Sequence, residues 1–416
     1  MNVGRSSLIY LSSSLLAGML PLLLMPFLTR QLAPEEYGTM VTVTTLVMVT
    51  LPLIKWGSVS YLGVQYFRSQ LAEFVDLFST ILVVPVVLTL VLVALFALMA
   101  GPIATLLDMP ATWVPLLPVM AAALYIPMAT LNLLRMRDHP FRYGAVELSS
   151  TALNFALTLW LVLAAGLSWE GRVLGIFGAN LVITLAVIVW LWRRRFITGT
   201  FRRSLLPEAL YYGSGVVPHE LANQSMRLAD RLIIAIVVGQ TALGTYGVAT
   251  QIATVMLVML TALNRAWTPF VFASLKEDTH QARVRLVQRS YLVYVGLLVF
   301  VVLFNLAVPL IYDWLVDPRY HGSQTAVFWL SLGYLFNGFY VTVVDRIFYL
   351  KKTHLLAVIT VLNATASLSL AFFLAGTMGA VGVPIAFAII SGVVAVMVFV
   401  LTQWLAPLPW LGALKP

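Results

Sequence analysis

Cysteine is absent from all 416 residues of this sequence. Disulfide bonds and thiolate metal sites are therefore excluded. The chain also lacks a glycine-rich phosphate loop ending in Lys-Ser or Lys-Thr, and its five histidines include no pair at metal-ligand spacing. We therefore predict a protein that is not an enzyme, with no catalytic residues, no metal site and no cofactor.

Charged residues are also scarce. They make up 10% of the chain, hydrophobic residues make up 61%, and the mean hydropathy is +0.95, whereas soluble domains carry about 25% charged residues. A chain of this length has room for about twelve membrane helices of roughly 20 residues each. The apolar runs predict transmembrane helices at residues 7–29, 38–58, 77–99, 113–135, 143–166, 172–192, 209–238, 244–264, 289–312, 325–349, 355–376 and 380–404. The predicted fold class is an all-α integral membrane protein.

The basic residues are distributed unevenly over this topology. With the N-terminus in the cytoplasm, most of the 25 lysines and arginines fall in loops and helix ends on that side, as the positive-inside rule requires. An even number of spans then places the C-terminus in the cytoplasm as well. The net charge of +9 is thus explained by topology and by contact with anionic membrane lipids, and we predict no nucleic-acid partner.

The two halves of the sequence share a pattern. Four matches occur at a constant spacing of 209 residues: Tyr125 with Tyr334, Arg137 with Arg346, Arg142 with Lys351, and Leu153-Asn154 with Leu362-Asn363. Gly38 and Gly244 head the second and eighth spans. We predict an N-terminal lobe of six spans (residues 1–192), a basic cytoplasmic linker (193–208) and a C-terminal lobe of six spans (209–416). Membrane transporters built from such repeats bind substrate between them, so we expect two pseudo-symmetric lobes around a central cavity.

The seventh predicted span, residues 209–238, carries charge within an apolar pattern. Four side chains at i, i+4, i+7 and i+11 share one helical face: Glu220, Gln224, Arg227 and Arg231. Ionisable groups in a membrane span normally face water or each other, so we interpret this span as the wall of a polar cavity. Because guanidinium groups bind phosphate bidentately, Arg227 and Arg231 are candidates for binding an anionic headgroup. Gln224 and Asn223 are candidate neighbours in that site.

Three carboxyl groups within spans are candidates for binding a coupling ion, H+ or Na+: Glu220, Asp230 and Glu147. A carboxyl group buried without a positive partner takes up a proton more readily than one in water. Two alternatives involve pairing and packing instead. Asp230 pairs with Arg227 along the helix at i, i+3, and Glu147 belongs to a polar stripe that joins helices.

Two basic residues at helix ends have open roles. Arg30, at the outer end of the first span, lines the mouth of the cavity or anchors the helix at the interface. Lys55, at the inner end of the second span, is a topology signal or a guide for an anion. The sequence alone does not choose between these roles.

Two short motifs resemble a known family. The first runs from Arg30 to Gly38, RQLAPEEYG, and the second combines Asp230-Arg231 with GTYGVA at 244–249. Both resemble the polysaccharide-transporter branch of the multidrug/oligosaccharidyl-lipid/polysaccharide (MOP) superfamily, and their order and spacing resemble Wzx-type O-antigen flippases over essentially the whole chain. The resemblance carries over Arg30, Asp230 and Arg231 as motif positions. Glu220 and Arg227 rest on the physical argument alone.

The resemblance implies two six-helix lobes like those of MATE transporters, and alternating access. It implies translocation of undecaprenyl-pyrophosphate-linked oligosaccharide, an O-antigen or similar repeat unit, from the cytoplasmic to the periplasmic leaflet of the bacterial inner membrane. The cycle would be coupled to an ion gradient, and polysaccharide-assembly proteins are expected partners.

Two other functions stay open at this point. A cation-coupled multidrug exporter shares the architecture, but its cavity would be lined by acids and aromatics rather than by additional arginines. A membrane glycan polymerase or ligase would need a substantial outer loop to hold catalytic groups, and the longest predicted outer segment is residues 100–112.

Overall fold

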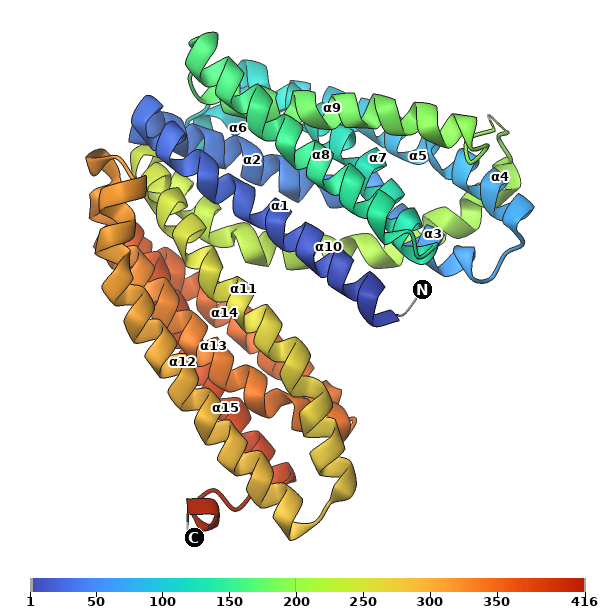
Figure 1. Cartoon of the computed structure of the whole chain (residues 1–416). Coiled ribbons are helices and arrows are strands. Elements are labelled where there is room, and N and C mark those ends of the chain that lie inside the picture. Colours follow the sequence, from blue (N-terminus) through green and yellow to red (C-terminus); the bar gives the residue numbers. More distant parts are fainter. Residues whose placement is uncertain (1–2, 199, 415–416) are drawn as a thin grey trace. The chain divides into compact units, whose positions relative to one another are not determined.

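The computed structural model describes residues 3–198 and 200–414, without the side chains of several residues, Arg227 among them. Every regular element in that part of the chain is helical (Figure 1). The long helices are α1 (Val3–Gln31), α2 (Pro34–Lys55), α4 (Leu71–Ile81), α5 (Val83–Leu98), α7 (Leu117–Met136), α8 (Pro140–Leu159), α9 (Trp169–Arg193), α10 (Leu206–Val237), α11 (Gln240–Glu277), α12 (His280–Leu315), α13 (Gln324–Tyr349), α14 (Thr353–Met378) and α15 (Gly382–Leu405). The shorter ones are α3 (Ser58–Tyr66), α6 (Ala100–Leu107), η1 (Ala111–Leu116), η2 (Trp160–Ala164), η3 (Arg203–Leu205), η4 (Pro318–Ser323), η5 (Gly379–Val381) and η6 (Gly412–Leu414).

Each predicted span overlaps a long helix, and the third, residues 77–99, covers both the end of α4 and α5. Ten stretches are long and apolar enough to cross a membrane, and one of them, residues 354–405, contains both α14 and α15. α10 is not among the ten; it is 32 residues long but carries charge along its length. A helix satisfies its own backbone hydrogen bonds, which lipid cannot do, so long apolar runs fold this way. The predicted all-α multi-pass membrane fold is confirmed.

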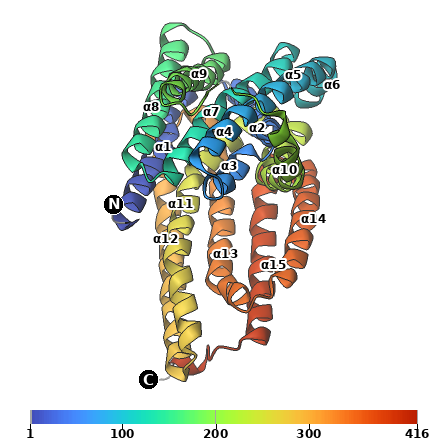
Figure 2. The same cartoon turned by 90° about the vertical axis from the view of Figure 1, so that its right-hand side faces the viewer.

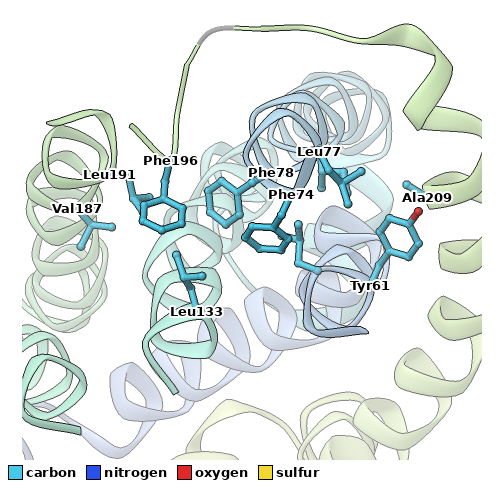
Figure 3. Close-up of a cluster of buried hydrophobic side chains, with 11 residues drawn as sticks. Tyr61, Phe74, Leu77, Phe78, Leu133, Val187, Leu191, Phe196 and Ala209 are labelled. Carbon is cyan, nitrogen blue, oxygen red and sulfur yellow. The ribbon is translucent and has the colours of Figure 1, made fainter. Parts of the chain in front are cut away.

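The first compact unit comprises Met1–Gly244. A cluster of buried hydrophobic side chains joins α3, α4, α7 and α9 to the segment that follows α9 and to the start of α10 (Figure 3). Phe196, from the segment after α9, packs in this cluster with Phe74, Phe78 and Leu191. Ala209, in the first turn of α10, belongs to the same cluster. One residue of the predicted linker, Phe196, and one of the seventh span, Ala209, therefore belong to the core of the first unit.

Polar contacts fix the same linker segment. Arg202 Nη2 lies 2.6 Å from Asp76 Oδ2, and Thr198 N donates to Ser79 Oγ at 3.0 Å. The boundary between the two compact units falls between Gly244 and Thr245, inside α11. α10 lies in the first unit, where it packs on α2, and Phe196 of the segment 193–208 is buried beside Phe74 and Phe78 of α4. The division into two lobes of six spans remains a prediction of topology.

Glycine allows α2 and the first turn of α11 to cross at very short range. A Cβ at Gly38 would collide with the Gln240 carbonyl oxygen, and a Cβ at Gly244 would collide with the Pro34 carbonyl oxygen. Thr42 Oγ1 donates to Gln240 Oε1 at 2.9 Å, and Gln240 Nε2 donates to the Leu107 carbonyl. The glycines of both motifs therefore permit a backbone contact at this crossing.

The second compact unit comprises Thr245–Pro416. In it α13 packs on α12 and α15, and α14 packs on α15 (Figure 2). Arg346 is buried near the end of α13 and donates to Thr402 Oγ1 at 2.6 Å and to the Ala406 carbonyl at 3.1 Å. Trp267 Nε1, from α11, donates to the Thr342 carbonyl at 3.0 Å. These bonds tie the end of α15 and the C-terminal third of α11 to α13.

Candidate functional site

An ion pair between α2 and α10 accounts for one predicted charge. Lys55 Nζ lies 2.9 Å from Glu220 Oε2, and the two side chains are 17% and 22% exposed. Beside this pair, Trp56 Nε1 donates to the Leu210 carbonyl at 3.0 Å, and a side chain at Gly213 would collide with Trp56. Lys55 thus compensates a carboxylate, a role that its position at a helix end had not indicated.

The residues that follow Glu220 on α10 occupy different environments. Asn223 is exposed, and its Nδ2 lies 3.0 Å from His219 Nε2. Gln224 is half-buried. The backbone of Arg227 lies within α10, but its side chain is outside the described residues. The predicted cavity-facing role of Arg227 therefore stays a prediction from spacing.

Arg231 lies near the C-terminal end of α10 and is half-buried. Its Nε is buried and has no hydrogen-bond partner within the described part of the chain. Its charge acts on Tyr37, a fully buried tyrosine at the start of α2. Asp230 is half-buried beside it in sequence, but successive helical residues do not face each other. Arg231 is therefore a partly buried guanidinium group on α10 whose Nε retains capacity for another acceptor.

Arg172 lies in the first turn of α9, where the sixth predicted span begins. Its Nη1 donates to Asn154 Oδ1 at 2.5 Å and to Thr158 Oγ1 at 2.9 Å, both on α8. Its charge also acts on Tyr37. Asn154 and Thr158 follow Glu147 at i+7 and i+11 on α8, which places them on the polar stripe that contains Glu147. In the sequence, this polar stripe indicated that a polar residue on a neighbouring helix contacts α8, and the structure shows that this residue is Arg172.

The first motif caps α2 and contacts the start of α9. Glu36 Oε2 accepts a bond from the backbone N–H of Ala33 at 2.7 Å, and Ser168 Oγ donates to Glu36 Oε1 at 2.5 Å. Arg30 is exposed in the last turn of α1. These contacts give the acidic part of the motif a structural role at the N-terminus of a helix.

Glu147 contacts α1 through hydroxyl groups. Its Oε1 accepts bonds from Ser14 Oγ at 3.0 Å and from Tyr143 OH at 3.4 Å, and Ser14 Oγ lies 3.2 Å from Oε2. Helices α1 and α8 approach closely here. A Cβ at Gly144 would lie only 2.8 Å from Ser13 Oγ, so the absence of a side chain at Gly144 permits this approach. Among the described residues, Glu147 forms no ion pair, in contrast to Glu220. The structure therefore distinguishes Glu220, which forms an ion pair, from Glu147, which is bonded to hydroxyl groups.

Comparisons with known proteins place this chain in a family. Residues 27–317 match the family described as polysaccharide biosynthesis protein. A Haemophilus influenzae protein named for the Lsg locus is 22% identical over 292 residues, which cover 67% of this chain and 68% of that protein.

Solved structures show the same fold. Lipid II flippase MurJ, in an inward closed conformation, gives a TM-score of 0.73 at 11% identity, covering 95% of this chain and 87% of MurJ. An inward-facing multidrug resistance transporter of the MATE family gives 0.71 at 15% identity, covering 93% of this chain and 94% of that protein. The family match spans more than half of the chain. The chain therefore belongs to the polysaccharide biosynthesis protein family, and it shares the fold of MurJ and of the MATE transporter.

Proposed function

We propose that this protein is a flippase for a lipid-linked oligosaccharide in the bacterial inner membrane. Its substrate is an undecaprenyl-pyrophosphate-linked repeat unit, such as that of an O-antigen, which it moves from the cytoplasmic to the periplasmic leaflet. Family membership supports a role in polysaccharide assembly. Polysaccharide-assembly proteins that make and use the repeat unit are the expected partners.

The observation that carries this proposal is the state of Arg231. A charged side chain within a membrane helix is costly, and such residues mark substrate or ion pathways. Arg231 is half-buried, and its Nε has no hydrogen-bond partner in the described part of the chain. A pyrophosphate supplies several anionic acceptors in the geometry that a guanidinium group binds best. The headgroup would satisfy Arg231 while the polyprenyl chain remains in lipid.

The ion pair at the other part of α10 argues against export of organic cations. Such an exporter needs an available carboxylate to attract its substrate. Glu220, a carboxyl group in the middle of α10, is already neutralised by Lys55 at 2.9 Å. The basic residues of the helix therefore favour an anionic substrate.

Coupling to a gradient of H+ or Na+ is part of the same proposal. Of the three candidate carboxyl groups, Glu147 fits this role best because its described partners are the hydroxyl groups of Ser14 and Tyr143. Hydroxyl groups can donate to a carboxylate and can also accept from a protonated carboxyl group. Glu220 is engaged by Lys55, and Asp230 is retained as a candidate from its position in the motif.

Surface display of glycan in cells that lack their own flippase tests the proposal. We expect Arg231→Ala and Arg227→Ala each to abolish or strongly reduce display while protein level and membrane insertion stay normal. Arg283→Ala is the matched control, because Arg283 is exposed and paired with Asp278 at 2.6 Å. Normal display by the Arg227→Ala, Arg231→Ala double variant would disprove headgroup binding by α10.

A further inference from the structure

The segment that follows α15 turns back along the second unit, and we call residues 406–414 the strap. Gln403, in the last turn of α15, fastens it with three bonds. Its Oε1 accepts from the Leu408 N–H at 3.2 Å and from Trp410 Nε1 at 3.0 Å, and its Nε2 donates to the Leu408 carbonyl at 2.9 Å. The Trp410 ring also contacts Phe399 of α15, with centroids 5.2 Å apart. The strap is therefore fixed to α15 as far as Trp410.

The far part of the strap lies on α12. Tyr291 OH donates to the Trp410 carbonyl at 3.1 Å, and Gln288 Nε2 donates to the Ala413 carbonyl at 3.3 Å. The Trp410 ring is stacked on Tyr294, with centroids 6.2 Å apart and an angle of 10° between the rings. Figure 2 shows the chain crossing from the end of α15 to the beginning of α12. Hydrogen bonds and ring contacts between neutral groups thus connect the strap to α12.

The strap has a compact structure of its own. The Trp410 N–H donates to the Leu408 carbonyl at 2.9 Å, and the Ala413 N–H donates to the Pro409 carbonyl at 2.9 Å. Pro407 and Pro409 each fix one backbone dihedral angle. The strap is therefore a folded extension of α15 that can leave α12 as one piece.

Little apolar surface holds the strap against its neighbours. Leu408 and Ala413 are buried, with 6% and 4% of their surface exposed, in a cluster that includes Val271 of α11 and Val287 of α12. Leu411, between them in the sequence, is 84% exposed. Segments with few buried apolar contacts open at a lower free energy than the core of a fold. Water can also replace each neutral hydrogen bond to α12, so this contact is reversible without unfolding of a helix.

The strap adds a link between helices that pack on a common neighbour. α12 packs on α13, and α15 packs on α13 and α14. The strap joins α15 directly to α12 at the end of the unit where α15 ends, and the distribution of basic residues predicts that this end is cytoplasmic. Elements that move during function come from the less stable contacts of a fold. A contact that restrains two helices and opens easily suits a step in which their spacing changes.

We propose that the strap is a releasable link between α15 and α12, and that its detachment from α12 is a step of the transport cycle. While the strap is attached, α12 is tied to α15 and also to α13, through Tyr294 OH and Thr342 Oγ1 at 2.9 Å. After detachment the bond to α13 remains, and α12 is free to shift relative to α15. The releasable link rests on the contacts alone, whereas its use in transport rests on the proposed function.

Thiol labelling measures detachment without any assay of transport. The chain has no cysteine, so Ala413→Cys introduces a single thiol that is buried while the strap is attached. In the full-length protein in lipid nanodiscs, this thiol should react with a maleimide to completion, but about tenfold or more slowly than the thiol of Leu411→Cys, which is exposed. Equal rates at the two positions, or no reaction of Ala413→Cys before the protein unfolds, would overturn the proposal.

A variant of α12 links this opening to the observed bond. Tyr291→Phe removes the donor to the Trp410 carbonyl and should speed labelling of Ala413→Cys about fivefold, because one hydrogen bond is lost. Tyr211→Phe, at an exposed tyrosine of the first unit, is the control and should leave the rate unchanged. If Ala413→Cys does not fold, hydrogen exchange of residues 406–414 replaces labelling, and Tyr291→Phe should accelerate it. The same rate with Tyr291→Phe as with Tyr211→Phe would contradict attachment to α12.

A reducible cross-link tests whether transport needs the detachment. Gln288→Cys and Ala413→Cys lie on the two sides of the contact, and a bis-methanethiosulfonate reagent joins them. With undecaprenyl-pyrophosphate-linked N-acetylglucosamine as the probe in proteoliposomes, the cross-link should abolish translocation, and a reducing agent should restore it. The control pair Gln281→Cys, Gln288→Cys places both thiols on α12 and should have no effect. Full translocation with the strap cross-linked would overturn the proposal. Slow labelling of Ala413→Cys in a protein that moves no probe would keep the releasable link and refute the proposed function.

Discussion

The two ends of α2 lie about 33 Å apart along the helix axis, since α2 has 22 residues that each advance it by about 1.5 Å. At the C-terminal end, Lys55 forms an ion pair with Glu220 of α10. At the N-terminal end, Glu36 accepts hydrogen bonds from the Ala33 N–H and from Ser168, and Thr42 donates to Gln240 of α11. An ion pair joins the helices at one end, whereas the described contacts at the other end are hydrogen bonds.

Backbone packing explains how the N-terminal end holds together without such a pair. Gly38 and Gly244 let α2 and α11 meet through main-chain atoms, and Gln240 adds hydrogen bonds to Thr42 and Leu107. No charged group is needed for this contact. Where glycine brings helices together, their contact needs no charged side chain, whereas Lys55 and Glu220 are used in helix association.

The largest effect is expected from substitution of the glycines at the N-terminal crossing. Gly38→Ala and Gly244→Ala would each place a methyl group against a backbone carbonyl oxygen that cannot rotate away. We expect almost complete loss of folded protein, measured as the monodisperse fraction on size-exclusion chromatography in detergent. Gly215→Ala is the control, because no neighbouring atom lies within 4 Å of a Cβ there. Normal folding of Gly244→Ala would refute the proposed role of close backbone packing.

The next effect concerns the ion pair at the C-terminal end. Lys55→Met or Glu220→Gln alone should destabilise the protein by about 1–3 kcal/mol, because the remaining charge is largely buried without a partner. The exchanged pair Lys55→Glu, Glu220→Lys should recover most of this loss. Thermal unfolding of the single and double variants in nanodiscs measures the coupling. Additive losses in the exchanged pair would contradict a stabilising contact.

A smaller effect on stability but a clear one on transport is expected at Glu147. Glu147→Gln keeps a side chain that can bond to Ser14 and Tyr143, but it no longer binds a proton or Na+. We expect gradient-driven transport in vesicles to fall about tenfold, in the range of typical coupling energies. Glu277→Gln, in an exposed pair with Arg285, is the control. Gradient dependence equal to that of the unmodified protein would return Glu147 to a packing role.

The smallest effect is expected from the carboxylate at the N-terminal end. Glu36→Gln removes a negative charge near the start of α9 and keeps an acceptor for the Ala33 N–H and Ser168. If positive charge there binds an anion, pyrophosphate affinity should rise about twofold, because a repulsive charge is removed. Titration of the variant against inorganic pyrophosphate measures this change. A fall in affinity would instead assign Glu36 to positioning of the site.

Sequence reasoning identified the helices because their physical cause is local. Each apolar run must satisfy its backbone groups within a helix when lipid surrounds it, and every predicted span overlaps a long helix. It also identified α10 as the charged span, because Glu220, Arg227 and Arg231 interrupt an apolar pattern. It did not identify Lys55 as the partner of Glu220, because the two residues are distant in the sequence.

The boundary between compact units shows the same limitation. The basic composition of residues 193–208 indicated a linker, but Phe196 within it is buried beside Phe74 and Phe78 (Figure 3). Phe196 connects the segment 193–208 to the core of the first unit, and Ala209 connects the start of α10 to the same core. A composition shift reports where an apolar pattern ends, and it carries no information on what the segment packs against.

By itself, the sequence determined the membrane class, the positions of the long apolar runs, the family motifs and the charge of α10. Hydropathy and length decide these features residue by residue along the chain. Only the tertiary structure decided that Glu220 is compensated by Lys55, that Arg172 is held by Asn154 and Thr158, and that Gly38 faces Gln240. These pairings depend on which helix faces meet, and close packing between distant segments sets that geometry.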